Sequence, residues 1–147
     1  MYTRSRVFGH GIGAATFVRE RTTTVEAIVE VAGRILLASL FLLSGFGKLG
    51  AHSQTEAYMS SFGVPGVLLP FVVITEIVGA IAIILGWKTR GAAFLLGGYS
   101  LLSALIFHSN FGDQVQMIMF LKNVSIAGGL LLLVANGAGP MSIDRRF

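Results

Sequence analysis

The stretch LLPFVVITEIVGAIAIILGW, residues Leu68–Trp87, is apolar almost throughout and carries one charged residue, Glu76, near its centre. About 20 mostly apolar residues are enough for a helix to cross the hydrocarbon core of a bilayer. A charge that faces lipid at that depth costs at least about 2.5–3.5 kcal/mol. The stretch therefore predicts a membrane-spanning helix whose Glu76 faces protein and is either paired with a cation or protonated.

The composition of the whole chain predicts an integral membrane protein. Of the 147 residues 54% are hydrophobic and only 12% are charged, which is too apolar for an ordinary soluble domain. The absence of cysteine excludes disulfides and cysteine-ligated zinc or iron–sulfur centres. The three histidines, His10, His52 and His108, offer no pair at matching depth to ligate a haem, and we predict no metal site. We also expect no nucleic-acid partner, because the basic residues lie mainly in tails and short loops, where they set membrane topology.

Three further segments are long and apolar enough to span a bilayer. We therefore predict an all-α membrane protein, a four-transmembrane-helix bundle in residues 25–147, preceded by an N-terminal cytoplasmic tail in residues 1–24. The four expected spans are Val31–Gly50, Gly66–Gly86, Gly91–His108 and Val115–Ala135.

Two capping-box patterns add detail to the helix boundaries. Thr23 followed by Glu26 predicts that the first helix begins near Thr24. Ser53 followed by Glu56 predicts a short helix in the first loop, lying along the membrane interface. Its apolar residues would be Tyr58, Met59 and Phe62.

The distribution of lysine and arginine predicts the orientation. Basic residues cluster before the first span, between the second and third spans, and after the fourth, whereas the other two loops hold almost none beyond Lys48. The positive-inside rule then places both termini and the middle loop in the cytoplasm. The residues concerned are Arg4, Arg6, Arg19, Arg21, Lys88, Arg90, Arg145 and Arg146.

Helical spacing predicts which residues face the interior of the bundle. With 3.6 residues per turn, each span carries its polar residues on a stripe of small side chains, and small residues let membrane helices approach closely. Tyr99 lies off the stripe of its helix, so we give it less weight. The expected inward stripes are Arg34, Ala38, Phe41, Gly45 and Lys48; Val72, Glu76, Gly79, Ala80 and Ile83; Ala93, Gly97, Ser100 and Ala104; and Lys122, Ser125, Gly129 and Asn136.

Depth selects the expected partner of Glu76. With a rise of about 1.5 Å per residue, Lys122 lies closest to the depth of Glu76, with Asn123 beside it. Arg34 lies toward the cytoplasm and Lys48 near the outer boundary. The candidate ligand-binding or buried polar cluster is Arg34, Lys48, Glu76, Lys122, Asn123 and His108. One carboxylate among three cations leaves surplus positive charge, which suits a quinone oxygen or an oxyanion.

Purely structural readings of the same residues stay open. Glu76 and Lys122 can form an ion pair that only fixes helix register. Arg34 can pair with Glu30, four residues earlier. Lys48 can extend to the outer interface, and a lone histidine such as His108 is more often a hydrogen-bonding surface residue than a metal ligand.

Several motifs resemble the DoxX family of small bacterial membrane proteins. They cover most of the chain from Val31 to Arg145 and include an Arg…Phe-x-x-Ser-Gly-x-x-Lys run, a glutamate within a span and a terminal Gly-x-Gly…Ser-x-Asp pattern. The stretches are GRILLASLFLLSGFGKL (Gly33–Leu49), GVP (Gly63–Pro65), EIVGAIAIILGWKTRGAA (Glu76–Ala93) and NVSIAGGLLLLVANGAGPMSID (Asn123–Asp144).

The resemblance implies a multi-pass protein of the bacterial cytoplasmic (inner) membrane, with the lipid bilayer and other membrane subunits or further copies of itself as partners. Some relatives are associated with thiosulfate:quinone oxidoreductase and others with redox-defence complexes. The matching polar positions are Arg34, Lys48 and Glu76. No intrinsic cofactor is expected, and a quinone is the ligand that the resemblance suggests.

Three functions remain open from the sequence. The leading one is a membrane subunit of a quinone-linked oxidoreductase or redox-defence complex, in which the chain itself need not be catalytic. The alternative is a non-catalytic membrane anchor or assembly factor, in which the polar cluster only holds helices together. A small-anion transporter is weaker, because no inverted repeat or pair of broken helices is visible in the chain.

Overall fold

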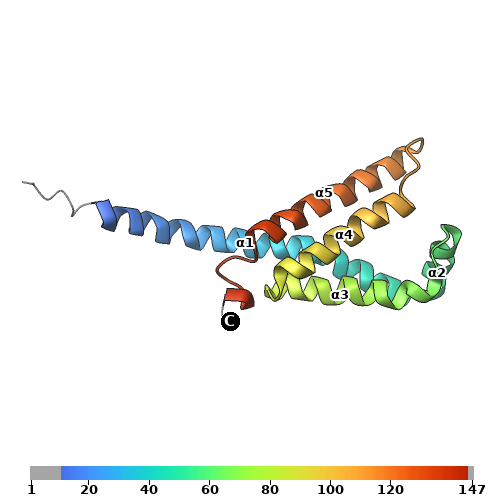
Figure 1. Cartoon of the computed structure of the whole chain (residues 1–147), viewed down its shortest axis with the longest axis horizontal. Helices are drawn as coiled ribbons and strands as arrows, with labels where there is room; N and C mark the ends of the chain where they lie inside the picture. Colours follow the sequence, from blue (N-terminus) through green and yellow to red (C-terminus); the bar gives the residue numbers. More distant parts are fainter. Residues whose placement is uncertain (1–10, 146–147) are drawn as a thin grey trace, which may run out of the picture.

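The computed structural model describes the backbone of residues 11–145 and the side chains of residues 24–145, and this part of the chain is helical apart from turns and short loops. Arg4, Arg6 and Arg146, used above to predict the orientation, lie outside the described residues. The elements in chain order are α1 (Gly11–Gly50), α2 (His52–Ser61), η1 (Gly66–Leu68), α3 (Leu69–Leu85), α4 (Thr89–Phe107), α5 (Gln114–Asn136) and η2 (Ile143–Arg145) (Figure 1).

Within residues 11–145, four helical segments are long and apolar enough to cross a membrane, as predicted. They are Thr24–Gly50 in α1, Gly66–Leu85 in η1 and α3, Thr89–Phe107 in α4, and Gln114–Asn136 in α5. The all-α, four-span fold class is therefore confirmed. The cytoplasmic placement of the termini and the assignment of residues 1–24 as a tail stay predictions.

Neither expected cap marks a helix start. Helix α1 begins at Gly11 and has 40 residues, so the expected start near Thr24 is wrong. At about 1.5 Å per residue α1 is about 60 Å long, roughly twice the thickness of the hydrocarbon core. The expected short helix in the first loop is present as α2, but Ala51 precedes it and no side chain caps its N-terminus.

The helices form two antiparallel pairs, α1 with α3 and α4 with α5 (Figure 1). The pairs meet at the end of the bundle that holds the α3–α4 turn and the C-terminal segment, which we call the terminal end. They diverge toward the opposite end, which holds α2 and the α4–α5 loop and which we call the loop end (Figure 1).

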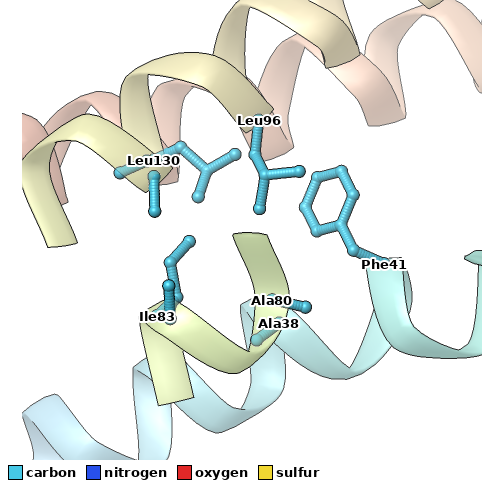
Figure 2. Packing of buried hydrophobic residues seen from close by; sticks show 9 residues of the cluster. Ala38, Phe41, Ala80, Ile83, Leu96 and Leu130 are labelled. Carbon is cyan, nitrogen blue, oxygen red and sulfur yellow. The ribbon is translucent and has the colours of Figure 1, made fainter. Parts of the chain in front are cut away.

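Buried alanines and a few large apolar residues form the core where the two pairs meet (Figure 2). Alanines let the helix backbones approach, while branched and aromatic side chains fill the remaining space. The labelled members are Ala38 and Phe41 from α1, Ala80 and Ile83 from α3, Leu96 from α4 and Leu130 from α5. At the loop end a smaller cluster joins α2 to α3 through Met59, Leu69 and Val73.

The predicted inward stripes are right for three spans and wrong for the fourth. The stripe residues of α1, α3 and α4 are buried or half-buried. On α5, however, Lys122, Ser125 and Asn136 are exposed, while Ala127 and Leu130 are buried. The inward face of α5 is therefore the one that carries Asn123, Ala127 and Leu130.

Gly45 lies where α1 and α3 approach each other closely. A Cβ atom at Gly45 would lie 2.7 Å from Ile77 Cγ1 and 3.5 Å from Glu76 Cβ, whereas a Cβ at Gly47 would meet nothing within 4 Å. We expect Gly45→Ala to lower the free energy of unfolding by about 1–3 kcal/mol, because the added methyl overpacks the contact. Gly47→Ala, on the same helix, is the matched control and should change it little. Equal effects of both substitutions on unfolding in detergent would show that the close approach does not matter.

Candidate functional site

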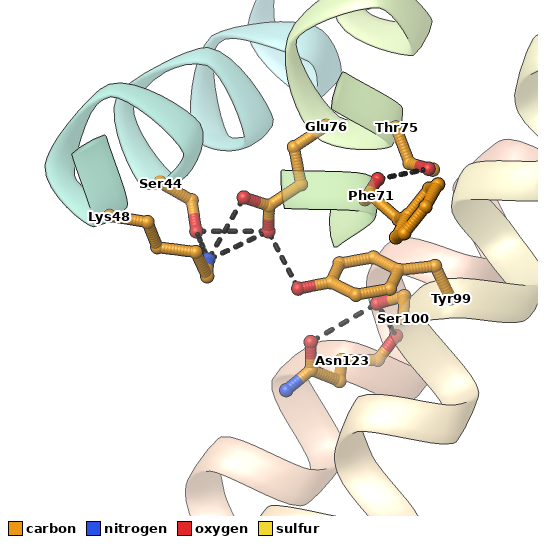
Figure 3. A network of polar contacts seen from close by, with 8 residues as sticks. All are labelled: Ser44, Lys48, Phe71, Thr75, Glu76, Tyr99, Ser100 and Asn123. Carbon is orange, nitrogen blue, oxygen red and sulfur yellow. Dashed lines mark hydrogen bonds and ion pairs between the residues drawn. The ribbon is translucent and has the colours of Figure 1, made fainter. Parts of the chain in front are cut away.

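The carboxylate of Glu76, on α3, is only 2% exposed and is held by residues from two other helices, α1 and α4 (Figure 3). Lys48 Nζ on α1 lies 2.9 Å from both Oε1 and Oε2. Ser44 Oγ, also on α1, donates to Oε1 at 3.1 Å, and the Tyr99 hydroxyl on α4 donates to Oε1 at 2.8 Å. The carboxylate buried in the second span is thus paired and hydrogen-bonded inside the protein, as its depth requires.

The local sequence of α1 explains how two donors reach one carboxylate. Ser44 and Lys48 are four residues apart and therefore lie on the same face of the helix. Lys48 also donates to Ser44 Oγ at 2.5 Å, which holds its ammonium beside Glu76. Gly45, adjacent to Ser44, has no side chain to keep α3 at a distance.

Tyr99 belongs to the site, although its position off the small-residue stripe gave it less weight as a candidate. Tyr99 is half-buried, and its ring extends from α4 so that its hydroxyl donates to Glu76 (Figure 3). The next residue, Ser100, donates to Asn123 Oδ1 and to the Asn123 carbonyl oxygen, both at 3.1 Å. Asn123 therefore joins α4 to α5 beside the Glu76 cluster but does not itself contact the carboxylate.

Lys122 is not the partner of Glu76, and this expectation was wrong. Its side chain is exposed, and Lys122 Nζ lies 3.2 Å from Met119 Sδ on the same helix. Lys48 takes the expected place, because its long side chain extends from the end of the first span toward the depth of Glu76. Lys122 points elsewhere because the adjacent residue, Asn123, is the one that faces α4.

Arg34 is buried, as predicted, but it does not join the Glu76 cluster. With 1% of its surface exposed, it donates from Nη1 to the Ile83 carbonyl at 3.4 Å and from Nη2 to the Met141 carbonyl at 2.6 Å. Among the described residues it forms these bonds instead of an ion pair with Glu30. Arg34 therefore links the end of α3 to the C-terminal segment.

His108 lies at the loop end, apart from Glu76. Its Nδ1 is 2.7 Å from Gln116 Oε1, so the ring links the end of α4 to the start of α5. Of the six candidate residues, only Lys48 and Glu76 have side chains that bond to each other, and Asn123 lies beside them, bonded to Ser100, the residue after Tyr99. The participation of any of the six in ligand binding stays a prediction.

The charge of the site differs from the expectation. One ammonium and one carboxylate balance each other, because Arg34 and Lys122 lie elsewhere. The expected surplus of positive charge around Glu76 is therefore wrong. The site combines a neutral ion pair with two hydroxyl groups, those of Ser44 and Tyr99.

The C-terminal segment folds back onto the α3–α4 turn at the terminal end. The Asp144 amide donates to the Gly86 carbonyl at 2.8 Å, and its carboxylate accepts from the Lys88 and Thr89 amides at 2.6 and 2.9 Å. Asp144 thus caps the first turn of α4 from a distant part of the chain. Burial pushes the pKa of Asp144 upward, but the hydrogen bonds from these amides outweigh it and hold the pKa below its ordinary value. Asp144 is therefore negatively charged at neutral pH.

Comparison with known sequences decides the family. The sequence model of the DoxX family matches residues 30–109, more than half of the chain. The chain belongs to the DoxX family. It is 44% identical over 121 residues to the inner membrane protein YqjF of Escherichia coli K12, which covers 82% of this chain and 93% of that protein.

Two further relatives extend the DoxX comparison. The inner membrane protein YphA of Escherichia coli K12 is 40% identical over 126 residues, covering 81% of this chain and 90% of YphA. The ER-derived vesicles protein ERV29 of Saccharomyces cerevisiae is 31% identical over 120 residues, which is 78% of this chain and 32% of ERV29. No solved structure matches the chain significantly. With the four spans, the bacterial relatives identify this DoxX protein as a multi-pass inner-membrane protein.

The residues that suggested DoxX have distinct places in the structure. The Ser-Gly-x-x-Lys run supplies two partners of Glu76 and the close approach between α1 and α3. The arginine that begins this pattern, Arg34, and the terminal Ser-x-Asp pattern instead meet at the terminal end, around Gly86. The DoxX motifs therefore mark one polar cluster within the membrane-spanning part and one set of hydrogen bonds at its end, which holds the C-terminal segment against α3 and α4.

Proposed function

We propose that this DoxX protein is a membrane subunit of a quinone-linked oxidoreductase or redox-defence complex, and that the cluster of Ser44, Lys48, Glu76 and Tyr99 binds the quinone headgroup. The observation that carries the proposal is the arrangement of an ammonium, a carboxylate and a phenol in one hydrogen-bonded set within the membrane-spanning helices. Quinones dissolve in this part of the bilayer, and polar groups buried there are functional candidates by default.

Lys48 is the hydrogen-bond donor that a ligand in the bilayer would reach first. Its side chain is 22% exposed, whereas that of Glu76 is 2% exposed. Lys48 donates to Ser44 as well as to both oxygens of Glu76. A ligand carbonyl would replace Ser44 as acceptor, because Glu76 would keep its bonds to Lys48 and Tyr99.

The balance of charge selects the ligand class. An oxyanion would need a positive surplus to offset its own charge, and the Lys48–Glu76 pair has none. A neutral carbonyl needs only a donor, which Lys48 provides. A bound quinone would supply the exchange of electrons and protons. The role of this chain would be to hold the headgroup, with Glu76 orienting both Lys48 and Tyr99, while a partner subunit would supply the electrons.

The test is the affinity of the purified full-length protein for a short-chain ubiquinone analogue, measured in detergent. We expect Glu76→Gln to weaken binding about tenfold, because it removes the charge that positions Lys48, and Tyr99→Phe to weaken it by a smaller factor. Tyr58→Phe, which removes the same hydroxyl group outside the cluster, and Lys122→Met, which removes a charge outside the cluster, should leave affinity unchanged. Unchanged affinity in Glu76→Gln and Tyr99→Phe, or no binding to the wild-type protein, would refute the proposal.

The second candidate is a non-catalytic anchor or assembly factor. The observation in its favour is that both oxygens of Glu76 already have partners within the described residues, as expected for a pair that only holds helices together. Under this function the wild-type protein would not bind the quinone analogue. Glu76→Gln would instead reduce the amount of a defined membrane partner that co-purifies from native membranes.

A further inference from the structure

A pocket of about 600 Å³ lies at the terminal end, away from the Glu76 cluster. It is bounded by the start of α4, the end of α5 and the C-terminal segment that follows α5. The spans on either side begin at Thr89 and end at Asn136. The pocket therefore opens at the depth where the hydrocarbon core gives way to lipid headgroups.

The charge of this pocket is positive. Lys88, Arg90 and Arg145 line it, and Asp144 is the acidic residue among its lining residues. Both oxygens of Asp144 accept hydrogen bonds from the Lys88 and Thr89 amides. This carboxylate therefore offsets the partial positive charge at the start of α4 as well as the charge of the basic side chains. Three cations and one carboxylate leave an excess of two positive charges.

Thr89 forms part of the pocket wall. Its side chain is fully buried, and its hydroxyl lies beside the Asp144 carboxylate and helps to hold the pKa of Asp144 below its ordinary value. Its backbone amide also donates to Asp144 at 2.9 Å. Thr89 thus holds Asp144 in place at the pocket wall.

Lys88 occupies an unusual backbone conformation at the rim. Its φ is 48°, the left-handed region, and it is the non-glycine residue of the described chain with positive φ. Glycine adopts this conformation freely, whereas other residues are disfavoured by about 1–2 kcal/mol. The turn thus holds a lysine side chain at the pocket where glycine would be conformationally easier.

We propose that this pocket binds the phosphate headgroup of an anionic phospholipid. Lys88, Arg90 and Arg145 supply the charge, and the position at the span ends makes a lipid the source of the phosphate. Basic pockets between membrane helices near the surface recognise such headgroups in this way. The site is independent of the proposed quinone site, because none of its residues contacts Glu76.

The test measures binding of dioctanoyl phosphatidylglycerol to the purified full-length protein in an uncharged detergent, alongside dioctanoyl phosphatidylcholine and inorganic phosphate. We expect phosphatidylglycerol to bind more tightly than either comparison compound. Lys88→Gly and Arg90→Gln should each weaken its binding about fivefold. Lys122→Gln, which removes one positive charge outside the pocket, is the control and should have no effect.

Each other outcome overturns part or all of the proposal. Equal binding of the two lipids, or full affinity in Lys88→Gly and Arg90→Gln, would mean that these basic residues only set topology. Binding of phosphate as tightly as phosphatidylglycerol would mean a site for a soluble anion. Misfolding does not confuse the result, because Lys88→Gly relieves the left-handed conformation and should unfold at the wild-type midpoint or above.

Discussion

Replacing Lys48 with methionine should lower the free energy of unfolding by about 3–5 kcal/mol, the largest effect that we expect of any substitution described. The change leaves the Glu76 carboxylate buried without its counter-charge, and removing one partner of a buried pair is strongly destabilising. Unfolding in mixed detergent micelles, followed by circular dichroism, measures the effect.

Lys122→Met is the matched control for this prediction. It makes the same substitution within a membrane span, but Lys122 is exposed and its ammonium lies beside Met119 instead of a carboxylate. We expect a much smaller effect. The double variant Lys48→Met/Glu76→Gln should recover much of the lost stability, because no buried charge remains unpaired. Equal losses for Lys48→Met and Lys122→Met would refute the assignment of Lys48 as the counter-charge.

Replacing Arg34 with leucine should detach the C-terminal segment and lower the free energy of unfolding by about 2–4 kcal/mol. The substitution keeps an apolar side chain in a buried position but removes the donor of the Met141 carbonyl and leaves the Ile83 carbonyl with the Gly86 amide alone. A hydrogen bond to a charged group contributes about 1.5–3 kcal/mol. Two measurements apply, unfolding in detergent and the rate at which a protease removes the residues after Asn136.

Arg34→Lys separates charge from geometry in the same experiment. Lysine keeps the positive charge, but its single ammonium does not reproduce the fork that reaches two carbonyls. We expect an intermediate loss of stability and an intermediate rate of proteolysis. If Arg34→Leu is cleaved no faster than the wild-type protein, the C-terminal segment is held by Asp144 alone and the role assigned to Arg34 is wrong.

The fold could be predicted from the sequence because the length and hydropathy of each span identify it as a membrane-spanning helix. The sequence was also sufficient for the inward faces of α1, α3 and α4, where small residues and polar residues share a stripe. On α5 the same rule failed because Lys122 and Asn123 are adjacent, and neighbouring residues point about 100° apart on a helix. Depth alone favoured the lysine, whereas the contact with Ser100 selects the asparagine.

The site was harder to predict than the fold because long side chains displace their functional atoms from their Cα positions. Lys48 starts near the end of its span and reaches Glu76, and Tyr99 reaches it from outside the expected stripe. The four-residue spacing of Ser44 and Lys48 was the available signal for the pair. No comparable signal existed for Arg34, because its partners are backbone carbonyls, which any residue provides.

The Lys48–Glu76 pair has a consequence for how the protein enters the membrane. Glu76 alone makes the insertion of its own span less favourable by about 2.5–3.5 kcal/mol, because it lies near the bilayer centre. The two charges neutralise each other only when α1 and α3 lie side by side. Biogenesis should therefore favour a route in which the insertion machinery retains the first span until the second emerges from the ribosome and releases the two as one hairpin.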